Sequence, residues 1–217
     1  MTNLFTILSL LDYCISDEVE SRSIFDIADN GNIQELKKAL ENNPDVNPVD
    51  GNGLTPLMYA AWGNRSSMII TELIKAGAKV GTRDKNGMTP LMHAAWKTYN
   101  AKIITELIKA GAKVNERDDI GMTPIMHAAL ANRHPKIIIA LINAGADVDN
   151  RDISGKTPLM YAAGMNTVEI ILELIKAGAD CKAIDNSGKS ATNYVHENWG
   201  LFLTKLAVEL EKIFNSS

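Results

Sequence analysis

Histidine side chains are the first groups from which this chain could build a catalytic or metal site. His93 and His127 lie 34 residues apart in matching sequence contexts, and Tyr59 and Tyr161 occupy the equivalent positions of the neighbouring copies. This interchange with tyrosine favours a half-buried stacking role for the two histidines over metal ligation.

The cysteines and the known catalytic motifs do not complete a site either. Neither Cys14 nor Cys181 has another cysteine or a histidine at metal-ligand spacing. The chain also lacks the G-x-S-x-G, P-loop, H-E-x-x-H and dinucleotide-binding patterns. We therefore predict a non-catalytic chain that uses no metal and no cofactor.

Aspartate recurs in a pattern that indicates a structural role. An aspartate stands at the same position in each copy of a turn-rich stretch such as RDKNG at 83–87. At such turns a short carboxylate accepts hydrogen bonds from nearby backbone N–H groups. The recurring residues are Asp50, Asp84, Asp118, Asp152 and Asp185.

An internal repeat positions all of these residues. When residues 53–84 are compared with 87–118, 22 of the 32 positions are identical. Identity at this level and at a fixed period identifies a repeat protein. The clearest motif is TPLMYAA, which recurs with little change every 34 residues, at 55–61, 89–95, 123–129 and 157–163.

Each copy predicts two helices followed by an extended finger. Thr55 is a favourable N-cap, and Pro56 suits the first helical position. The second helix carries an apolar face that includes Ile70 and Leu73, and Gly77 follows as a left-handed C-cap. Two helices of this length cannot bury their apolar faces alone, so the copies must stack into an all-α solenoid.

These residues resemble the ankyrin repeat, whose pattern is close to D-x-x-G-x-T-P-L-H-x-A-A, then a second helix and G-A-x-V. The resemblance covers roughly residues 22–217. It implies stacked helix–turn–helix units with β-turn or hairpin fingers. In such a stack the inner helices line a concave groove and the outer helices form its back.

Two departures from the ankyrin pattern concern the loops and the fingers. Three units have 34 residues where 33 is usual, and the extra residue falls between the two helices, as in KTYNA at 97–101. The resemblance implies a histidine that ties finger to helix by hydrogen bonds, but methionine stands there, so the resemblance does not predict this tie for the chain. The methionines are Met58, Met92, Met126 and Met160.

The array of 22–217 is expected to contain six units, with the first and last acting as caps. Residues 1–21 would form an amphipathic helix docked on the first cap. An export or lipidation signal and disorder are the alternatives for that segment. The units start near residues 22, 55, 89, 123, 157 and 190.

Partner binding is the function that the resemblance implies, and it suggests a place. In ankyrin repeats the two residues after Ala-Ala open onto the groove. Trp62, Trp96 and Leu130 would form an apolar ridge there, flanked by Lys97 and Met165. Exposed tryptophan is a frequent hot-spot residue in interfaces. The alternative is that each tryptophan covers the next unit's helix and is mostly buried.

The finger tips are a second candidate surface. Apolar residues on neighbouring tips would face a partner there, together with one lysine. The predicted tip residues are Lys85, Met88, Ile120, Met122 and Ile153.

A row of arginines stands behind the tips. Arg83, Arg117 and Arg151 are each followed by aspartate. They could form a ladder of inter-unit salt bridges, each contributing about 0–1 kcal/mol. They could instead form a basic strip that faces an acidic partner and sets its orientation.

The charge distribution bears on the kind of partner. The net charge of −4 argues against a general nucleic-acid binder. Residues 55–156 nevertheless carry 14 basic and 9 acidic side chains, and this positive centre would steer an acidic or mixed partner. No run approaches ~18 consecutive apolar residues, so no membrane span is expected. We expect a cytoplasmic protein, with secretion as an effector left open.

The sequence thus predicts a monomeric, non-catalytic module that binds another protein through its groove and fingers. The alternative is a structural or assembly protein that self-associates through its apolar N-terminal segment or its C-terminal helix. Asn47 and Asn115 occupy a finger position that the resemblance marks as a hydroxylation site in ankyrin proteins of animal cells.

Overall fold

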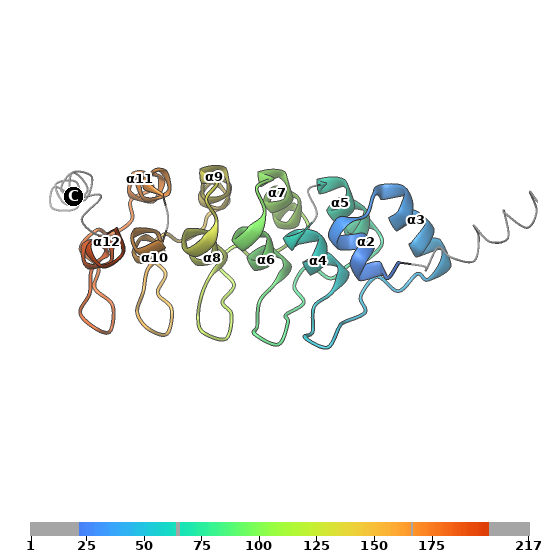
Figure 1. Cartoon of the computed structure of the whole chain (residues 1–217), viewed down its shortest axis with the longest axis horizontal. Helices are drawn as coiled ribbons and strands as arrows, with labels where there is room; N and C mark the ends of the chain where they lie inside the picture. The colour runs from blue at the N-terminus through green and yellow to red at the C-terminus, as the bar shows by residue number, and fades with distance from the viewer. Residues whose placement is uncertain (1–21, 64–65, 166, 200–217) are drawn as a thin grey trace, which may run out of the picture.

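The helices form a single file of stacked pairs with one finger per pair (Figure 1). The structure is a computed structural model, and it describes residues 22–63, 66–165 and 167–199. In each pair an inner helix lies beside the finger and an outer helix lies behind it, and all fingers project on the same side. The chain is therefore an all-α repeat solenoid, as its sequence predicts.

The helix bounds follow the repeated motifs. The inner helices are α2 (Ile24–Asn30), α4 (Pro56–Trp62), α6 (Pro90–Lys97), α8 (Pro124–Ala131), α10 (Pro158–Met165) and α12 (Ala191–Trp199). The outer helices are α3 (Ile33–Asn42), α5 (Ser67–Lys75), α7 (Ala101–Lys109), α9 (Pro135–Asn143) and α11 (Val168–Lys176). The predicted helices in residues 1–21 and near the C-terminus lie outside the described residues.

Threonine and methionine cap the inner helices reciprocally. The hydroxyl oxygen of Thr55 accepts a hydrogen bond from the backbone N–H of Met58 at 3.3 Å. The sulfur of Met58 accepts one from the backbone N–H of Thr55 at 3.4 Å. Methionine thus takes the place of the acidic partner in a capping box. The same pair of bonds recurs at Thr89 and Thr157.

Glycine ends the outer helices, as predicted. Gly77 has a φ of +97°, a backbone conformation that an L side chain disfavours. The turn lets the N–H of Ala78 reach the carbonyl of Leu73 at 2.9 Å, which satisfies one of the free carbonyls at the helix end. The equivalent glycines are Gly111, Gly145 and Gly178.

The core runs continuously through the stack between the two rows of helices. Paired alanines such as Ala60 and Ala61 are fully buried and let successive inner helices approach closely. The outer helices contribute larger side chains, and Ile70 and Leu73 are fully buried. Burying each such side chain stabilises the fold by about 1.5–3 kcal/mol.

One aspartate carboxylate closes each finger and ties it to the inner helix. Oδ1 of Asp118 accepts hydrogen bonds from the backbone N–H groups of Ile120 (3.1 Å) and Met122 (2.8 Å). Its Oδ2 lies 2.8 Å from Nε2 of His127. The partner on the helix always stands nine residues after the aspartate. The other pairs are Asp50–Tyr59, Asp84–His93, Asp152–Tyr161 and Asp185–Tyr194.

The tie between finger and helix is therefore present, one residue after the methionine. His93 and His127 have only 6% of their surface exposed, less than the half-buried state that the sequence indicated. In addition to stacking, each donates a hydrogen bond to a finger aspartate. Because an ionised carboxylate can only accept, Nε2 carries the proton in both pairs.

Neighbouring fingers are joined by backbone and arginine hydrogen bonds. The N–H of Ile153 donates to the carbonyl of Ile120 at 3.1 Å. Arg83 donates to the carbonyl of Arg117 at 2.7 Å, Arg117 donates to that of Arg151, and Arg151 reaches the next finger in the same way. The predicted inter-unit ladder is present, but its common partner is a carbonyl, and Arg83 alone of the three adds ion pairs within the described residues.

Removing one finger carboxylate should destabilise the fold strongly. Asp118→Ala would leave two backbone N–H groups and the buried His127 without their acceptor, which we expect to cost about 3 kcal/mol or more. Urea unfolding followed by circular dichroism measures this change. The matched control is Asp119→Ala, since the neighbouring Asp119 is exposed and its ion pair with Arg83 is worth about 0–1 kcal/mol. Equal losses in the two variants would contradict the role of Asp118.

Candidate protein-interaction surface

The two tryptophans are exposed on one side and supported on the other. Trp62 has 40% and Trp96 has 42% of its surface exposed. The ring centroid of Trp62 lies 6.4 Å from that of His93, and the centroid of Trp96 lies 6.2 Å from that of His127. Each tryptophan thus packs against the inner helix of the next unit on one side and is exposed to solvent on the other. The predicted exposure of the tryptophans and the alternative, that each covers the next unit's helix, are therefore both partly correct.

The supporting histidines connect the tryptophans to the fingers. Nε2 of His93 lies 2.9 Å from Oδ2 of Asp84. Burial lowers the pKa of His93, and Asp84 offsets this effect only in part. At neutral pH the ring is therefore uncharged, and it lies beside Trp62 with the two ring planes tilted by 44°.

The aspartate of the next unit is held in its ionised form. Burial alone would raise the pKa of Asp118, but the hydrogen bonds from His127 and from the backbone of Met122 and Ile120 outweigh it and lower the pKa. A row of contacts runs from Asp118 through His127 to Trp96. The carboxylate that closes the finger therefore also holds the histidine against which this tryptophan packs.

The remaining predicted ridge residues lie beside the tryptophans in different degrees of exposure. Nζ of Lys97 lies 5.5 Å from the ring centroid of Trp62, a cation–π distance that links two units. Leu130 is partly buried, and Met165 has 63% of its surface exposed. The predicted ridge is therefore strongest at the two tryptophans and weaker at Leu130.

The loop with the extra residue adds an aromatic side chain that the sequence analysis missed. Tyr99 has 46% of its surface exposed, and its ring centroid lies 6.0 Å from that of His134. The buried Asn132 holds this loop, because its side-chain amide donates to the carbonyls of Ala95 (2.9 Å) and Thr98 (2.7 Å). The variability of 97–101 between units was the available signal for Tyr99.

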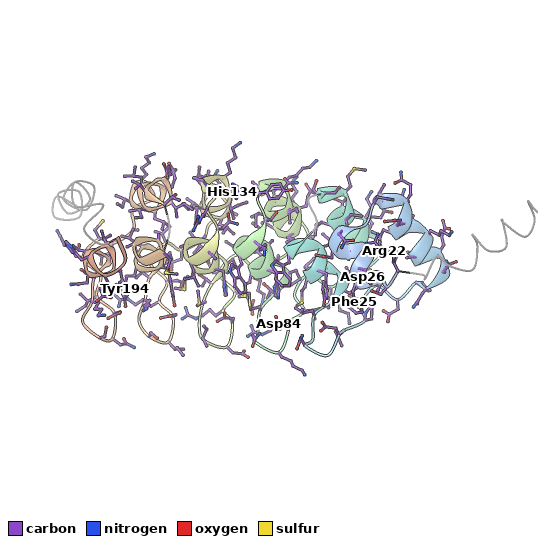
Figure 2. The ribbon with its side chains drawn as sticks, viewed as in Figure 1. Arg22, Phe25, Asp26, Asp84, His134 and Tyr194 are labelled. Carbon is purple, nitrogen blue, oxygen red and sulfur yellow. The ribbon has the colours of Figure 1, made fainter. Side chains whose placement is uncertain are left out.

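These loops and the first turns of the outer helices after them form one surface, which we call the inter-helix surface. It comprises the exposed side chains of residues 62–68, 96–102 and 130–136, apart from 64–65, which are not described. His134 marks it on the outer-helix row, whereas Asp84 and Tyr194 lie toward the fingers (Figure 2).

The finger tips differ from the prediction at two positions. Ile120 and Ile153 have 50% and 67% of their surface exposed, and Lys85 is exposed. Met88 and Met122 were predicted to project from the tips, but only 6% and 3% of their surface is exposed. That prediction was wrong, because these methionines stand at the base of the finger. Their N–H groups bond the finger aspartate and their carbonyls accept its N–H, so the side chains turn into the stack.

The finger asparagines also serve the stack. The side-chain amide of Asn47 donates to the carbonyl of Gly77 at 3.1 Å, and its oxygen accepts from the N–H of Lys79 at 2.9 Å. Asn115 makes the equivalent bonds two units later. Both ends of each amide are therefore engaged across a unit boundary.

Two further findings on the described residues concern metal ligation and membrane crossing. No three His, Cys, Asp or Glu side chains among them are grouped so that they could hold a metal ion. No helix of the part of the chain that the structure describes has the length and apolarity needed to cross a membrane.

A comparison with protein families decides the identity of the fold. The family model for ankyrin repeats (3 copies) matches residues 24–118 and also residues 98–185. The chain belongs to the ankyrin-repeat family. Ankyrin repeats generally act as protein–protein interaction modules and are typically non-catalytic. None of the curated proteins compared with this ankyrin chain matches it.

The depressed pKa of His93 makes stability depend on pH. Below about pH 6.5 the unfolded chain binds a proton at this residue that the folded chain does not, so stability should fall from about pH 7 to pH 5. His93→Tyr should weaken this fall, because Tyr59 and Tyr161 make the equivalent bond to aspartate in neighbouring units.

Urea midpoints at the two pH values, measured for the wild type and for His93→Tyr, test this prediction. The tyrosine variant should be folded at neutral pH and show the smaller shift. An identical pH dependence in both proteins would show that His93 does not titrate in this way.

Proposed function

We propose that this ankyrin-repeat chain is a non-catalytic module that binds a partner protein through its groove and finger tips, with Trp62 and Trp96 as anchors. The observation that carries the proposal is the exposure of these two tryptophans on adjacent units, each held in place by a buried histidine. Large aromatic side chains bury about 150–250 Å² each in an interface. Holding them in place before binding reduces the entropy lost on association.

The other surface residues have distinct roles in the proposal. Lys97, Leu130 and Met165 extend the contact area beside the anchors. Ile120 and Ile153, with Lys85, contact the partner from the finger tips and add specificity. The arginines hold the fingers at a fixed spacing, and in this way they set the orientation of the partner; they are Arg83, Arg117 and Arg151.

A double substitution tests the anchors. The Trp62→Ala, Trp96→Ala variant should lose a partner captured from the lysate of the source organism, since each hot-spot truncation costs about 2 kcal/mol or more. Ile120→Ala, Ile153→Ala is the matched control on the finger tips and should weaken binding less. Circular dichroism must first show that both variants are folded. Undiminished capture by the tryptophan variant would contradict the proposal.

Self-assembly is the second candidate function, and one observation favours it. The first helix pair leaves a cleft of about 410 Å³ at the N-terminal end of the described array. Ile24, Ile27 and Ala39 give it an apolar lining that an apolar segment of this or another copy could fill. The two segments predicted to self-associate lie outside the described residues.

Light scattering of the full chain over a hundredfold range of concentration separates these functions. A binding module that acts alone should keep the mass of one chain throughout. A mass that rises to two or more chains with concentration would favour self-assembly.

A further inference from the structure

The inter-helix surface carries cations that the fold does not neutralise. Lys97, Lys102, Arg133 and Lys136 are all exposed there. Within the described part of the chain none of the four forms an ion pair. At the other end of α7, by contrast, Lys109 is paired with a glutamate at 3.2 Å.

Acidic residues are excluded from this surface and resume on either side of it. Residues 62–71, 96–105 and 130–139 contain no aspartate or glutamate. The outer helices of the units before and after do carry one in their first turn, Glu35 in α3 and Glu169 in α11. Three central units therefore lack acidic residues on this surface, and the four described cations lie in two of them.

Fold stability does not account for two of these lysines. Lys102 and Lys136 occupy the second positions of α7 and α9. The positive end of the helix dipole lies there, so acidic side chains stabilise this position and cations destabilise it. A stabilising choice is available in the same scaffold, as Glu169 shows.

The cations alternate with apolar and aromatic side chains. Trp62, Trp96 and Tyr99 lie among them, and Lys97 is placed over the Trp62 ring. We propose that the inter-helix surface binds an acidic, extended segment of another protein, whose carboxylates meet the lysines and arginine while an apolar side chain packs on the tryptophans. This inference rests on the proposed function and specifies the class of partner.

Cations interleaved with aromatic rings also suit single-stranded nucleic acid, but the boundaries of the surface favour a short acidic peptide. At one boundary Asp29 lies against Gly63, where its Oδ1 occupies the space that a Cβ at Gly63 would take. Glu169 stands at the other boundary. A long polyanion would cross both acidic units, whereas a short acidic segment remains on the two units that carry the cations.

Peptide display gives the direct test, because it requires no knowledge of the natural partner. A library of random peptides is selected on the immobilised full chain. The enriched peptides should carry net negative charge together with an aromatic or leucine side chain, and their affinity should fall as salt is added. A single-stranded uridine oligonucleotide should show no saturable binding at physiological salt.

Two charge-reversal variants locate the site. Lys102→Glu, Lys136→Glu should lower the affinity of an enriched peptide by about tenfold or more, since two attractive contacts become repulsive. The thermal unfolding midpoint of this variant should stay level or rise, because acidic side chains stabilise the N-terminal positions of helices. The matched control is Lys75→Glu, Lys109→Glu. It changes the net charge by the same amount, but at the C-terminal ends of α5 and α7. It should bind the peptide normally even if it is less stable.

The outcomes separate the two proposals. Enriched peptides that need Trp62 and Trp96 but carry no acidic bias, or equal losses in both charge variants, would overturn the acidic partner and leave the proposed function standing. Saturable oligonucleotide binding that the Lys102→Glu, Lys136→Glu variant abolishes would replace the peptide with nucleic acid. Failure to enrich any peptide that depends on the tryptophans would count against both proposals.

Discussion

The carboxylate at the turn of each finger accepts hydrogen bonds from two backbone N–H groups of its own turn and from a tyrosine or histidine of the inner helix. A buried charge is tolerated only when it is fully hydrogen-bonded, so this group permits one arrangement of finger and helix. The carboxylate also affects the ionisation of the side chain that donates to it. At the last described unit, burial and the hydrogen bond to Asp185 raise the pKa of Tyr194 to about 12, which keeps the phenol a donor. Because the arrangement recurs from Asp50 to Asp185, it sets the spacing of the whole stack.

The proposed binding surface depends on the same interaction at two of its positions. In two central units the tyrosine is replaced by histidine, whose flat ring also supports a tryptophan of the preceding unit. The scaffold residues repeat almost without change, while the loops between the helices differ from unit to unit. Asn132 shows how such a loop becomes a fixed surface, since one buried amide holds the loop of the preceding unit at two carbonyls. A rigid scaffold with variable loops is the usual arrangement for recognition.

Local signals explain most of what the sequence predicts correctly. The Thr-Pro starts and the glycine ends of the helices depend on neighbouring residues alone, and they lie where expected. The bond between aspartate and the residue nine positions later was missed, although its constant spacing is visible in the sequence. The burial of Met88 and the carbonyl partners of Arg117 could not be predicted in this way. Both depend on how one finger lies against the next, which no single unit specifies.

Hydrogen–deuterium exchange of the full chain, alone and with a bound peptide or partner, tests the central claim most directly, because it reports where the partner lies without altering a residue. The account predicts that protection on binding concentrates in residues 96–102 and 130–136 and around Trp62. Protection confined to the finger tips, at residues 85–86, 119–120 and 153–154, would show that the inter-helix surface is not the binding site.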